Sequence, residues 1–142
     1  MLARLINAGI ITALLALATI ASAQNAVPDL KGKWAGTVET VRRGEVFEHY
    51  TGSSPEVTFG SRDYTITLEQ QEGRRFAGTR ASARATDPLI GMIGLDGKRL
   101  HMVDNDGTLT GELLGSDEME VCRTEVTPQS MIVSCGTFTR ER

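Results

Sequence analysis

The chain has 142 residues, and its 15 Lys and Arg residues against 18 Asp and Glu residues give a formal net charge of −3. A mildly acidic chain without a basic stripe is a poor candidate for binding nucleic acid. Aromatic residues make up only 5% of the sequence. The part beyond residue 23 is rich in Gly, Thr and Val, a mixture that favours strands and tight turns over helices.

The first residues have the pattern of an export signal. Arg4 gives a short positive start, Leu5 to Ile20 is almost wholly apolar, and Ala21-Ser22-Ala23 is a small-x-small cleavage pattern. We therefore predict a signal peptide over residues 1–23 and a single domain over residues 24–142. The alternative is an uncleaved anchor, but the apolar run is shorter than the roughly 20 residues of a membrane span. We expect the mature protein to be periplasmic or secreted, with no stable membrane insertion.

From Trp34 onward, apolar and polar residues alternate between regularly spaced turn residues, which predicts an all-β sandwich or barrel. The first half of this part contains five expected strands: Lys33–Val41, Glu45–Tyr50, Val57–Phe59, Tyr64–Glu69 and Arg75–Arg84. Thr51–Glu56 is the longest irregular stretch between them, and Ala85–Pro88 is a second expected loop.

Turns fix the register of the second half. Asp96-Gly97 is a two-residue hairpin signal that places Ile93 opposite Leu100. The residues from Asp104 to Gly107 suit a type I turn closed by a glycine at positive φ, which places Met102 opposite Leu109. Gly115-Ser116-Asp117 then leads into a strand over Met119–Val126.

The two cysteines test the register of the last hairpin. If Pro128 and Gln129 are its central residues, Cys122 lies opposite Cys135 at a non-hydrogen-bonded pair. The Cα atoms of such a pair are about 4.5 Å apart, near the short end of the disulfide range. A longer loop with another register is the alternative. In an exported chain this pair indicates one structural disulfide, because a redox role favours a C-x-x-C pattern or a lone reactive thiol.

These registers give one consistent inner face. It consists of Trp34, Gly36, Val38, Tyr64, Ile66, Leu68, Phe76, Gly78, Ile93, Leu100, Met102, Leu109, Leu113, Met119, Val121, Ile132 and Phe138. Eight to ten strands joined by short turns form an antiparallel up-and-down meander. Such a meander removes its exposed edges most economically by closing into a barrel.

Three short motifs resemble those of lipocalins and avidin-like proteins, the calycins. Gly32-Lys33-Trp34 after Leu30 resembles the G-x-W signature of their first strand, Phe76-Ala77-Gly78-Thr79 resembles an F-x-G-T element, and Gly136–Arg140 is similar to the last avidin strand. The resemblance implies an eight-stranded barrel in which Gly32 and Trp34 form a structural plug at one end. A basic residue, Arg140 or Arg142, would lie over the tryptophan. Biotin binding is not implied, because avidin-type pockets use several tryptophans and this chain has one.

Four inward-facing side chains are candidate ligand contacts: Arg80, Arg123, Tyr64 and Met102. A buried guanidinium group needs a carboxylate or a bound anion. One arginine could therefore hold the head group of an acidic ligand. The alternative, which we favour, places both arginines at the barrel mouth with their charged ends in water. The inner glycines likewise have two interpretations, a ligand cavity or the bends of a tightly coiled barrel, and we favour the bends.

The remaining polar residues do not form a catalytic pattern. Asp104 to Gly107 has part of a calcium-loop sequence but lacks the later ligands, so we predict a turn and no metal site. His49 and His101 have no spacing that links them to a nucleophile, and His101 is expected to face outward. We therefore expect neither an enzyme nor a cofactor.

Two function hypotheses follow. The first is an exported, non-enzymatic binding protein that holds a small, mostly apolar ligand in the barrel. The second is a protein-interaction or inhibitor module of the cell envelope that acts through its loops, Thr51–Glu56 and Ala85–Pro88, because exposed loops carry recognition on rigid scaffolds. The partner is then a small molecule or an envelope protein.

Overall fold

The computed structural model describes residues 26–44, 49–50 and 52–142. Its elements are the strands β1 (Gly32–Gly44), β2 (Ser54–Glu72), β3 (Arg75–Ala81), β4 (Thr86–Ile93), β5 (Arg99–Val103), β6 (Thr108–Leu113), β7 (Glu118–Val126) and β8 (Ser130–Arg140). The predicted signal peptide, and residues 45–48 and 51 of the predicted strand and loop, lie outside the described residues. Within the described part, no helix has the length and apolarity needed to cross a membrane.

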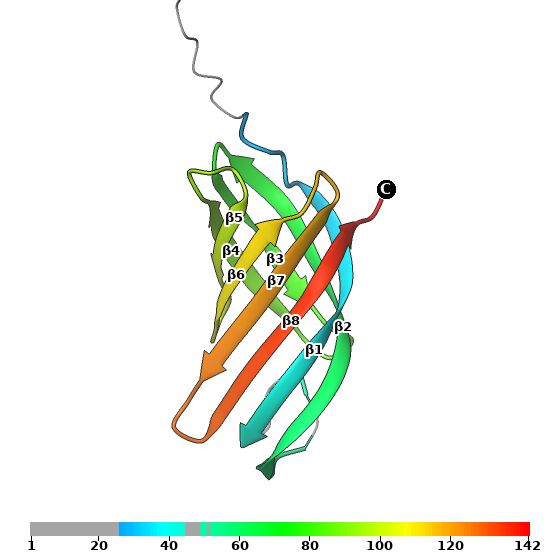
Figure 1. Cartoon of the computed structure of the whole chain (residues 1–142), viewed down its shortest axis with the longest axis vertical. Coiled ribbons are helices and arrows are strands. Elements are labelled where there is room, and N and C mark those ends of the chain that lie inside the picture. Colours follow the sequence, from blue (N-terminus) through cyan, green and yellow to red (C-terminus); the bar gives the residue numbers. More distant parts are fainter. Residues whose placement is uncertain (1–25, 45–48, 51) are drawn as a thin grey trace, which may run out of the picture.

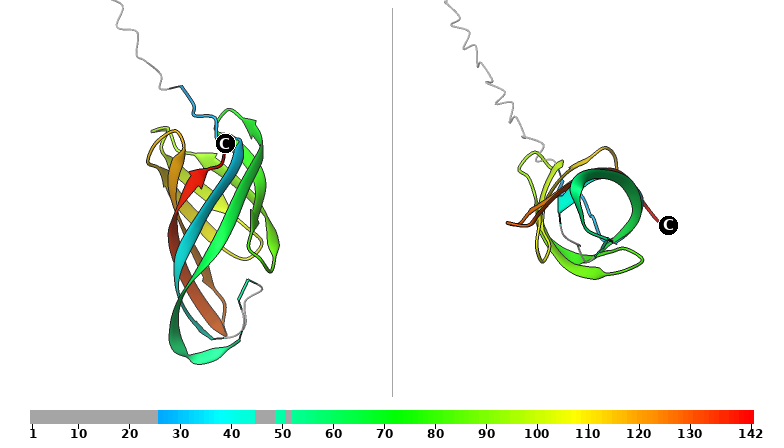
Figure 2. Two further views of the ribbon diagram at one scale, coloured as in Figure 1. Left: turned by 90° about the vertical axis from the view of Figure 1, so that its right-hand side faces the viewer. Right: turned by 90° about the horizontal axis from the view of Figure 1, so that it is seen from below.

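The eight strands form one antiparallel meander that closes on itself, because β1 pairs with both β2 and β8 (Figure 1). This confirms the predicted fold class. We call the end where β1 begins and β8 ends the closed end, and the opposite end the polar end. At the polar end β1, β2, β7 and β8 extend past the shorter strands, so one wall of the barrel is taller than the other (Figures 1 and 2).

The predicted hairpin registers of the second half are confirmed. Ile93 pairs with Leu100, Met102 with Leu109, and Cys122 with Cys135. The backbone groups of Thr127 and Ser130 hydrogen-bond across Pro128 and Gln129. One detail is wrong: Gly107 does not have a positive φ. The Asp104 carboxylate accepts the backbone N–H of Gly107 (2.8 Å) and holds the turn without a left-handed residue.

The strand boundaries of the first half were predicted incorrectly. Residues Ser54–Glu56 of the predicted irregular stretch belong to one 19-residue strand, β2 (Ser54–Glu72). The same strand contains both predicted strands Val57–Phe59 and Tyr64–Glu69. Tyr50 lies outside the strands, and β4 takes in most of the predicted loop over Ala85–Pro88. The start of β2 is held by its ladder with β1 and buries few side chains. Hydrophobic alternation therefore could not reveal it.

The apolar core fills the half of the barrel next to the closed end. The predicted inner face is confirmed, with its large side chains buried apart from the half-buried Leu113, and two further leucines, Leu30 and Leu89, join it. The inner glycines do not leave a cavity in the wall. A Cβ atom on Gly36, Gly78 or Gly136 would lie within 2.4 Å of a backbone oxygen of the neighbouring strand. These glycines let strands approach closely, as a tightly coiled small barrel requires.

Candidate functional site

The closed end is sealed around Trp34, which is fully buried. Its indole Nε1 donates to the backbone oxygen of Leu30 (2.9 Å), and the guanidinium carbon of Arg140 lies 4.3 Å from the ring centroid. Arg140 also donates to the backbone oxygens of Asp29 (2.7 Å) and Lys31 (2.9 Å). The structure thus brings the residues of the predicted plug together, with Gly32 beside Arg140 at a φ of 130° that favours glycine.

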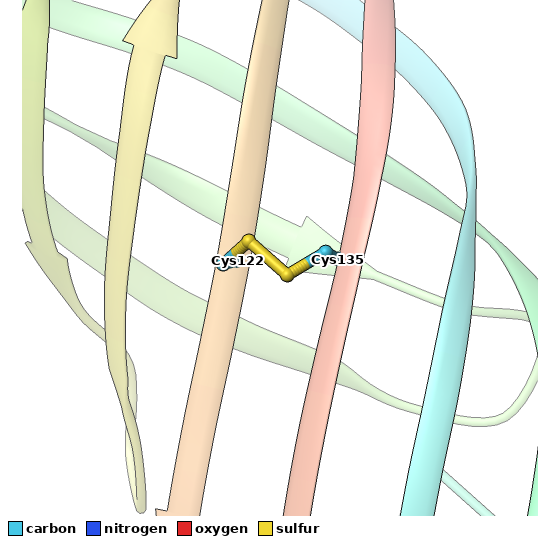
Figure 3. The surroundings of a disulfide bond; sticks show 2 residues. All are labelled: Cys122 and Cys135. Carbon is cyan, nitrogen blue, oxygen red and sulfur yellow. A yellow bond between two sulfur atoms is a disulfide. The ribbon is translucent and has the colours of Figure 1, made fainter.

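Cys122 and Cys135 lie on neighbouring positions of β7 and β8 and form a disulfide with a Cα–Cα distance of 4.0 Å (Figure 3). Both residues are half-buried and alternate with inward-facing neighbours, so the bond lies on the outside of the barrel. The disulfide closes the β7–β8 hairpin and is not part of an internal site.

The polar end contains a buried network of charged side chains centred on Arg123. Its Nε donates to Asp104 Oδ2 (2.6 Å), Nη2 donates to Asp104 Oδ1 (3.2 Å), and Nη1 donates to Glu125 Oε2 (2.7 Å). Nη2 also forms an ion pair with Asp106. The side chains of Arg123 and Asp104 are only 6% and 0% exposed. The expectation that the arginine ends lie in water is therefore wrong, and carboxylates offset the cost of burying this charge.

Arg80 is buried beside the same network but is less completely paired. Its guanidinium carbon lies 3.6 Å from the ring centroid of Tyr64. Its Nη1 lies 3.8 Å from Asp104 Oδ2, which is an ion-pair distance but too long for a hydrogen bond. Among the described residues, neither Arg80 Nη1 nor the Tyr64 hydroxyl has a partner with hydrogen-bond geometry, although Tyr50 and Arg80 both lie close enough to the phenol to affect its pKa. These two predicted contacts thus meet, and both are incompletely satisfied.

His49 and Tyr50 cover the polar end of the interior. His49 Nε2 lies 2.6 Å from Asp87 Oδ2, its Nδ1 lies 2.8 Å from Ser82 Oγ, and its ring centroid lies 5.3 Å from that of Tyr64. The Tyr50 hydroxyl shares a 3.1 Å hydrogen bond with Thr40 Oγ1. Both residues are buried. The barrel is therefore closed by side chains at this end too, but by polar and aromatic ones.

Two of the three carboxyl groups that pair with Arg123, Asp104 and Glu125, have opposite pKa shifts. Burial favours the neutral form of both. For Asp104, the hydrogen bonds and the charges of Arg123 and Arg80 outweigh burial, so its pKa is lowered. For Glu125, burial outweighs the hydrogen bond from Arg123, so its pKa is raised. Burial also raises the pKa of the Tyr64 hydroxyl above its usual value, so the phenol stays protonated and can donate.

Three carboxylates of the polar end could in principle hold a metal ion, because one oxygen each of Asp87, Asp104 and Asp106 lies within 4.8 Å of the others. Their oxygens already have partners, however. Arg123 forms ion pairs with Asp104 and Asp106, and a ring nitrogen of His49 lies within hydrogen-bond distance of Asp87. The positive charge of the Arg123 guanidinium group, which contacts two of these three aspartates, would repel a cation. The donor set therefore does not suit a metal.

The fourth predicted contact, Met102, lies apart from this network. It packs in the apolar core beside Gly91 and Phe76. Sequence reasoning missed the partners of the two arginines. Arg123 and Glu125 are two residues apart on β7, so the sequence could have predicted that both face inward. Asp87 has the same spacing from the buried Leu89 on β4. His49 had no such signal, because it lies in a turn outside the strands and not in the strand that the sequence predicted over Glu45–Tyr50.

Comparisons with known proteins place few limits on function. No protein-family model matches the chain, and no curated protein sequence matches it. Among solved structures, the S-type phycobiliprotein lyase from Guillardia theta aligns with 80% of this chain and 89% of its own, with 15% identity and a TM-score of 0.36. A similarity at this level of identity and superposition does not extend to function.

Proposed function

We propose that this chain is an exported, non-enzymatic binding protein that takes a small ligand at the polar end of its barrel. The observation that carries the proposal is the pair of buried, unsatisfied polar groups on Arg80 and Tyr64. Buried polar groups are nearly always paired in folded proteins, so an exception suggests a missing partner such as a ligand or a water molecule. The leader-like residues 1–23 support export, and the disulfide is consistent with an oxidising compartment.

The position of the core changes the kind of ligand that we expect. The sequence alone favoured a mostly apolar ligand inside the barrel. Large side chains such as Trp34, Ile66 and Phe138 occupy the half next to the closed end. The ligand in our proposal therefore binds near Arg80 and Tyr64 and carries a polar group, with any apolar part directed toward the mouth.

Native mass spectrometry and thermal-shift measurements with a metabolite library test this function. We expect at least one compound to add its mass to the protein and to raise the midpoint of thermal unfolding. Arg80→Met should weaken that effect, whereas Lys33→Met, an exposed substitution at the closed end, should not. If no compound in the library binds, or if binding is indifferent to Arg80, the proposed site is wrong.

A second candidate function, a protein-interaction module, rests on the outer surface near the polar end. Six apolar side chains of β1, β2, β7 and β8 are exposed on this face: Val41, Val57, Phe59, Val126, Met131 and Val133. Val41 pairs with both Phe59 and Val133, so they form a row across three strands. Contiguous exposed apolar surface is typical of interaction sites.

A cross-linking pull-down from envelope extract distinguishes this candidate. The wild-type protein should retain a defined partner that Phe59→Asp loses, because Phe59 is 83% exposed and its loss leaves the core intact. If Phe59→Asp retains the same proteins as the wild type, this surface is not the site of interaction.

A further inference from the structure

The inner wall formed by β2 and β3 at the polar end carries three buried polar atoms without a hydrogen-bond partner among the described residues. They are Arg62 Nε, Tyr64 Oη and Arg80 Nη1. Each of them can donate a hydrogen bond. We propose that these three donors form a binding site for an oxyanion, the carboxylate or phosphate group of a ligand. The proposal rests on the function proposed above and specifies the chemistry of its ligand.

The strand geometry places the three donors on one surface. Arg62 and Tyr64 are two residues apart on β2, so both side chains face the barrel interior. Arg80 on β3 pairs with Ile66, the next inward residue of β2. Its guanidinium group turns back over the Tyr64 ring at 3.6 Å. Along the register of this wall, Tyr64 therefore lies between Arg62 and the Arg80–Ile66 pair.

The charges on this wall are incompletely balanced, unlike those around Arg123. Arg123 has three carboxylate partners and cannot take another anion. Arg80 has one carboxylate at 3.8 Å, and that carboxylate already binds the guanidinium fork of Arg123. Arg62 stacks on the ring of Tyr50 at 4.9 Å, and the described residues give it no ion-pair partner. An oxyanion would supply the missing counter-charge and accept from all three donors.

Acidic groups close to Arg80 restrict where the oxyanion lies, and one of them is the buried Asp87, the cross-strand partner of Arg80 on β4. Asp104 stays ionised and, with Asp106, repels a second anion near Arg123. The favourable position is therefore on the Arg62 side of Arg80, next to the Tyr64 hydroxyl. His49 and Tyr50 cover this position with their rings, so a ligand that reaches the donors displaces these rings from Tyr64 and Arg62.

A set of ligands with one chain length and different head groups tests the proposal. The probes are octanoate, octyl phosphate, octanol and octylammonium, with acetate and inorganic phosphate as head groups alone. Binding is measured by calorimetry and by the NMR signals of the arginine Nε–H groups. We expect an oxyanion to bind and to move the Arg62 Nε–H signal, and we expect octanol and octylammonium not to do so. Octanoate and octyl phosphate distinguish a carboxylate from a phosphate source.

Three variants locate the site. Tyr64→Phe keeps the ring under Arg80 and removes only the unpaired hydroxyl, so the fold should be retained while the oxyanion binds several-fold more weakly. Arg80→Met should weaken binding about tenfold or more, because a charge-assisted hydrogen bond is lost. Arg84→Met is the matched control, since Arg84 is an exposed arginine in the β3–β4 loop at the same end of the barrel.

The outcomes separate this inference from the function on which it rests. Binding of an oxyanion that weakens in Tyr64→Phe and Arg80→Met but not in Arg84→Met supports both. If octanol or octylammonium binds as well as octanoate, or if oxyanion binding is indifferent to Tyr64 and Arg80, the oxyanion site is wrong. The broader function then depends on the metabolite library. If neither these probes nor the library binds, both proposals fail.

Discussion

At the scale of single residues, Asp104 and Glu125 show how burial and pairing compete on one arginine. Asp104 accepts two hydrogen bonds from Arg123 and two from backbone N–H groups, whereas Glu125 accepts one from Arg123. The better-paired carboxylate has the lowered pKa and the other has the raised one. Two substitutions that each remove one negative charge should therefore have different consequences.

We predict that Asp104→Asn lowers the free energy of unfolding at pH 7 by about 3–5 kcal/mol, because it leaves Arg123 buried without its main partner. Glu125→Gln should not lower it, because the raised pKa of Glu125 means that the fold already disfavours the ionised carboxylate. A carboxyl group whose pKa is lowered on folding stabilises the fold at pH values above its ordinary pKa. A group whose pKa is raised stabilises the fold at pH values below its ordinary pKa. Urea unfolding at pH 4 and pH 7 measures both effects. Equal losses for the two variants at pH 7 would contradict the assignment.

Trp34 is the residue on which the closed end depends. Trp34→Ala should lower the free energy of unfolding by about 3–5 kcal/mol, because it removes a fully buried ring, its hydrogen bond to Leu30 and the surface under Arg140. Chemical denaturation measures the loss. Trp34→Phe keeps part of the packing and should lose less. An equal affinity of both variants for a ligand of the polar end would support a purely structural role.

At the scale of elements, the hairpins of the second half were predictable because short turns fix the register and hence the face of every side chain. β2 was not predictable as one strand. Its first half turns exposed residues toward solvent and is held by backbone pairing with β1, which leaves no alternating pattern in the sequence. A strand segment of this kind, held by backbone pairing with few buried side chains, has a sequence pattern similar to that of a loop.

Gly78 on β3 and Gly60 on β2 differ in the space around them, so their alanine variants form a matched pair of stability tests. A Cβ on Gly78 would lie 1.9 Å from the backbone oxygen of Thr67, whereas a Cβ on Gly60 would meet nothing within 4 Å. Gly78→Ala should therefore destabilise the barrel by about 1–3 kcal/mol or more. Gly60→Ala should leave stability unchanged or raise it by less than about 1 kcal/mol. Thermal unfolding measures both, and similar midpoints would show that β2 and β3 can separate without cost.

The disulfide is a property of the β7–β8 hairpin. Its two cysteines are 13 residues apart, and closing a loop of this length stabilises a fold by about 3 kcal/mol in the chain-entropy model. Replacing both cysteines by serine should lower the free energy of unfolding by about that amount and leave the barrel folded. Intact mass after alkylation should show no free thiol before reduction and two afterwards. Two free thiols in the exported protein would contradict the pairing.

At the scale of the whole molecule, the sequence was sufficient for the closed barrel and its inner face but not for the site. Alternation and turns determine which residues face inward, and this correctly placed Arg80 and Arg123 inside. It could not reveal the partners that come from turns, Asp104 and His49, although the inward spacing of Glu125 on β7 and of Asp87 on β4 was visible in the sequence. The interior is thus divided into an apolar half and a charged half that no local pattern indicates.

This division predicts that acid loosens the two ends of the barrel separately. The closed end is held mainly by the fully buried Trp34 ring, which has no titratable group, and by the guanidinium group of Arg140 stacked on it. At the polar end, the stabilisation from Asp104 is lost as the pH falls below the ordinary carboxyl range and through its lowered pKa. Hydrogen exchange, normalised to the unfolded rate at each pH, should therefore lose protection first around Asp104 and Arg80. Protection around Trp34 should persist to lower pH.

Asp104→Asn is the control for this experiment, because it should loosen the polar end already at pH 7 and remove the acid dependence there. Strongly acidic conditions, below the ordinary carboxyl pKa, would then open the proposed ligand site while Trp34 still holds the barrel together. Loss of protection at both ends in a single transition would show instead that the charged network and the apolar core unfold as one cooperative unit.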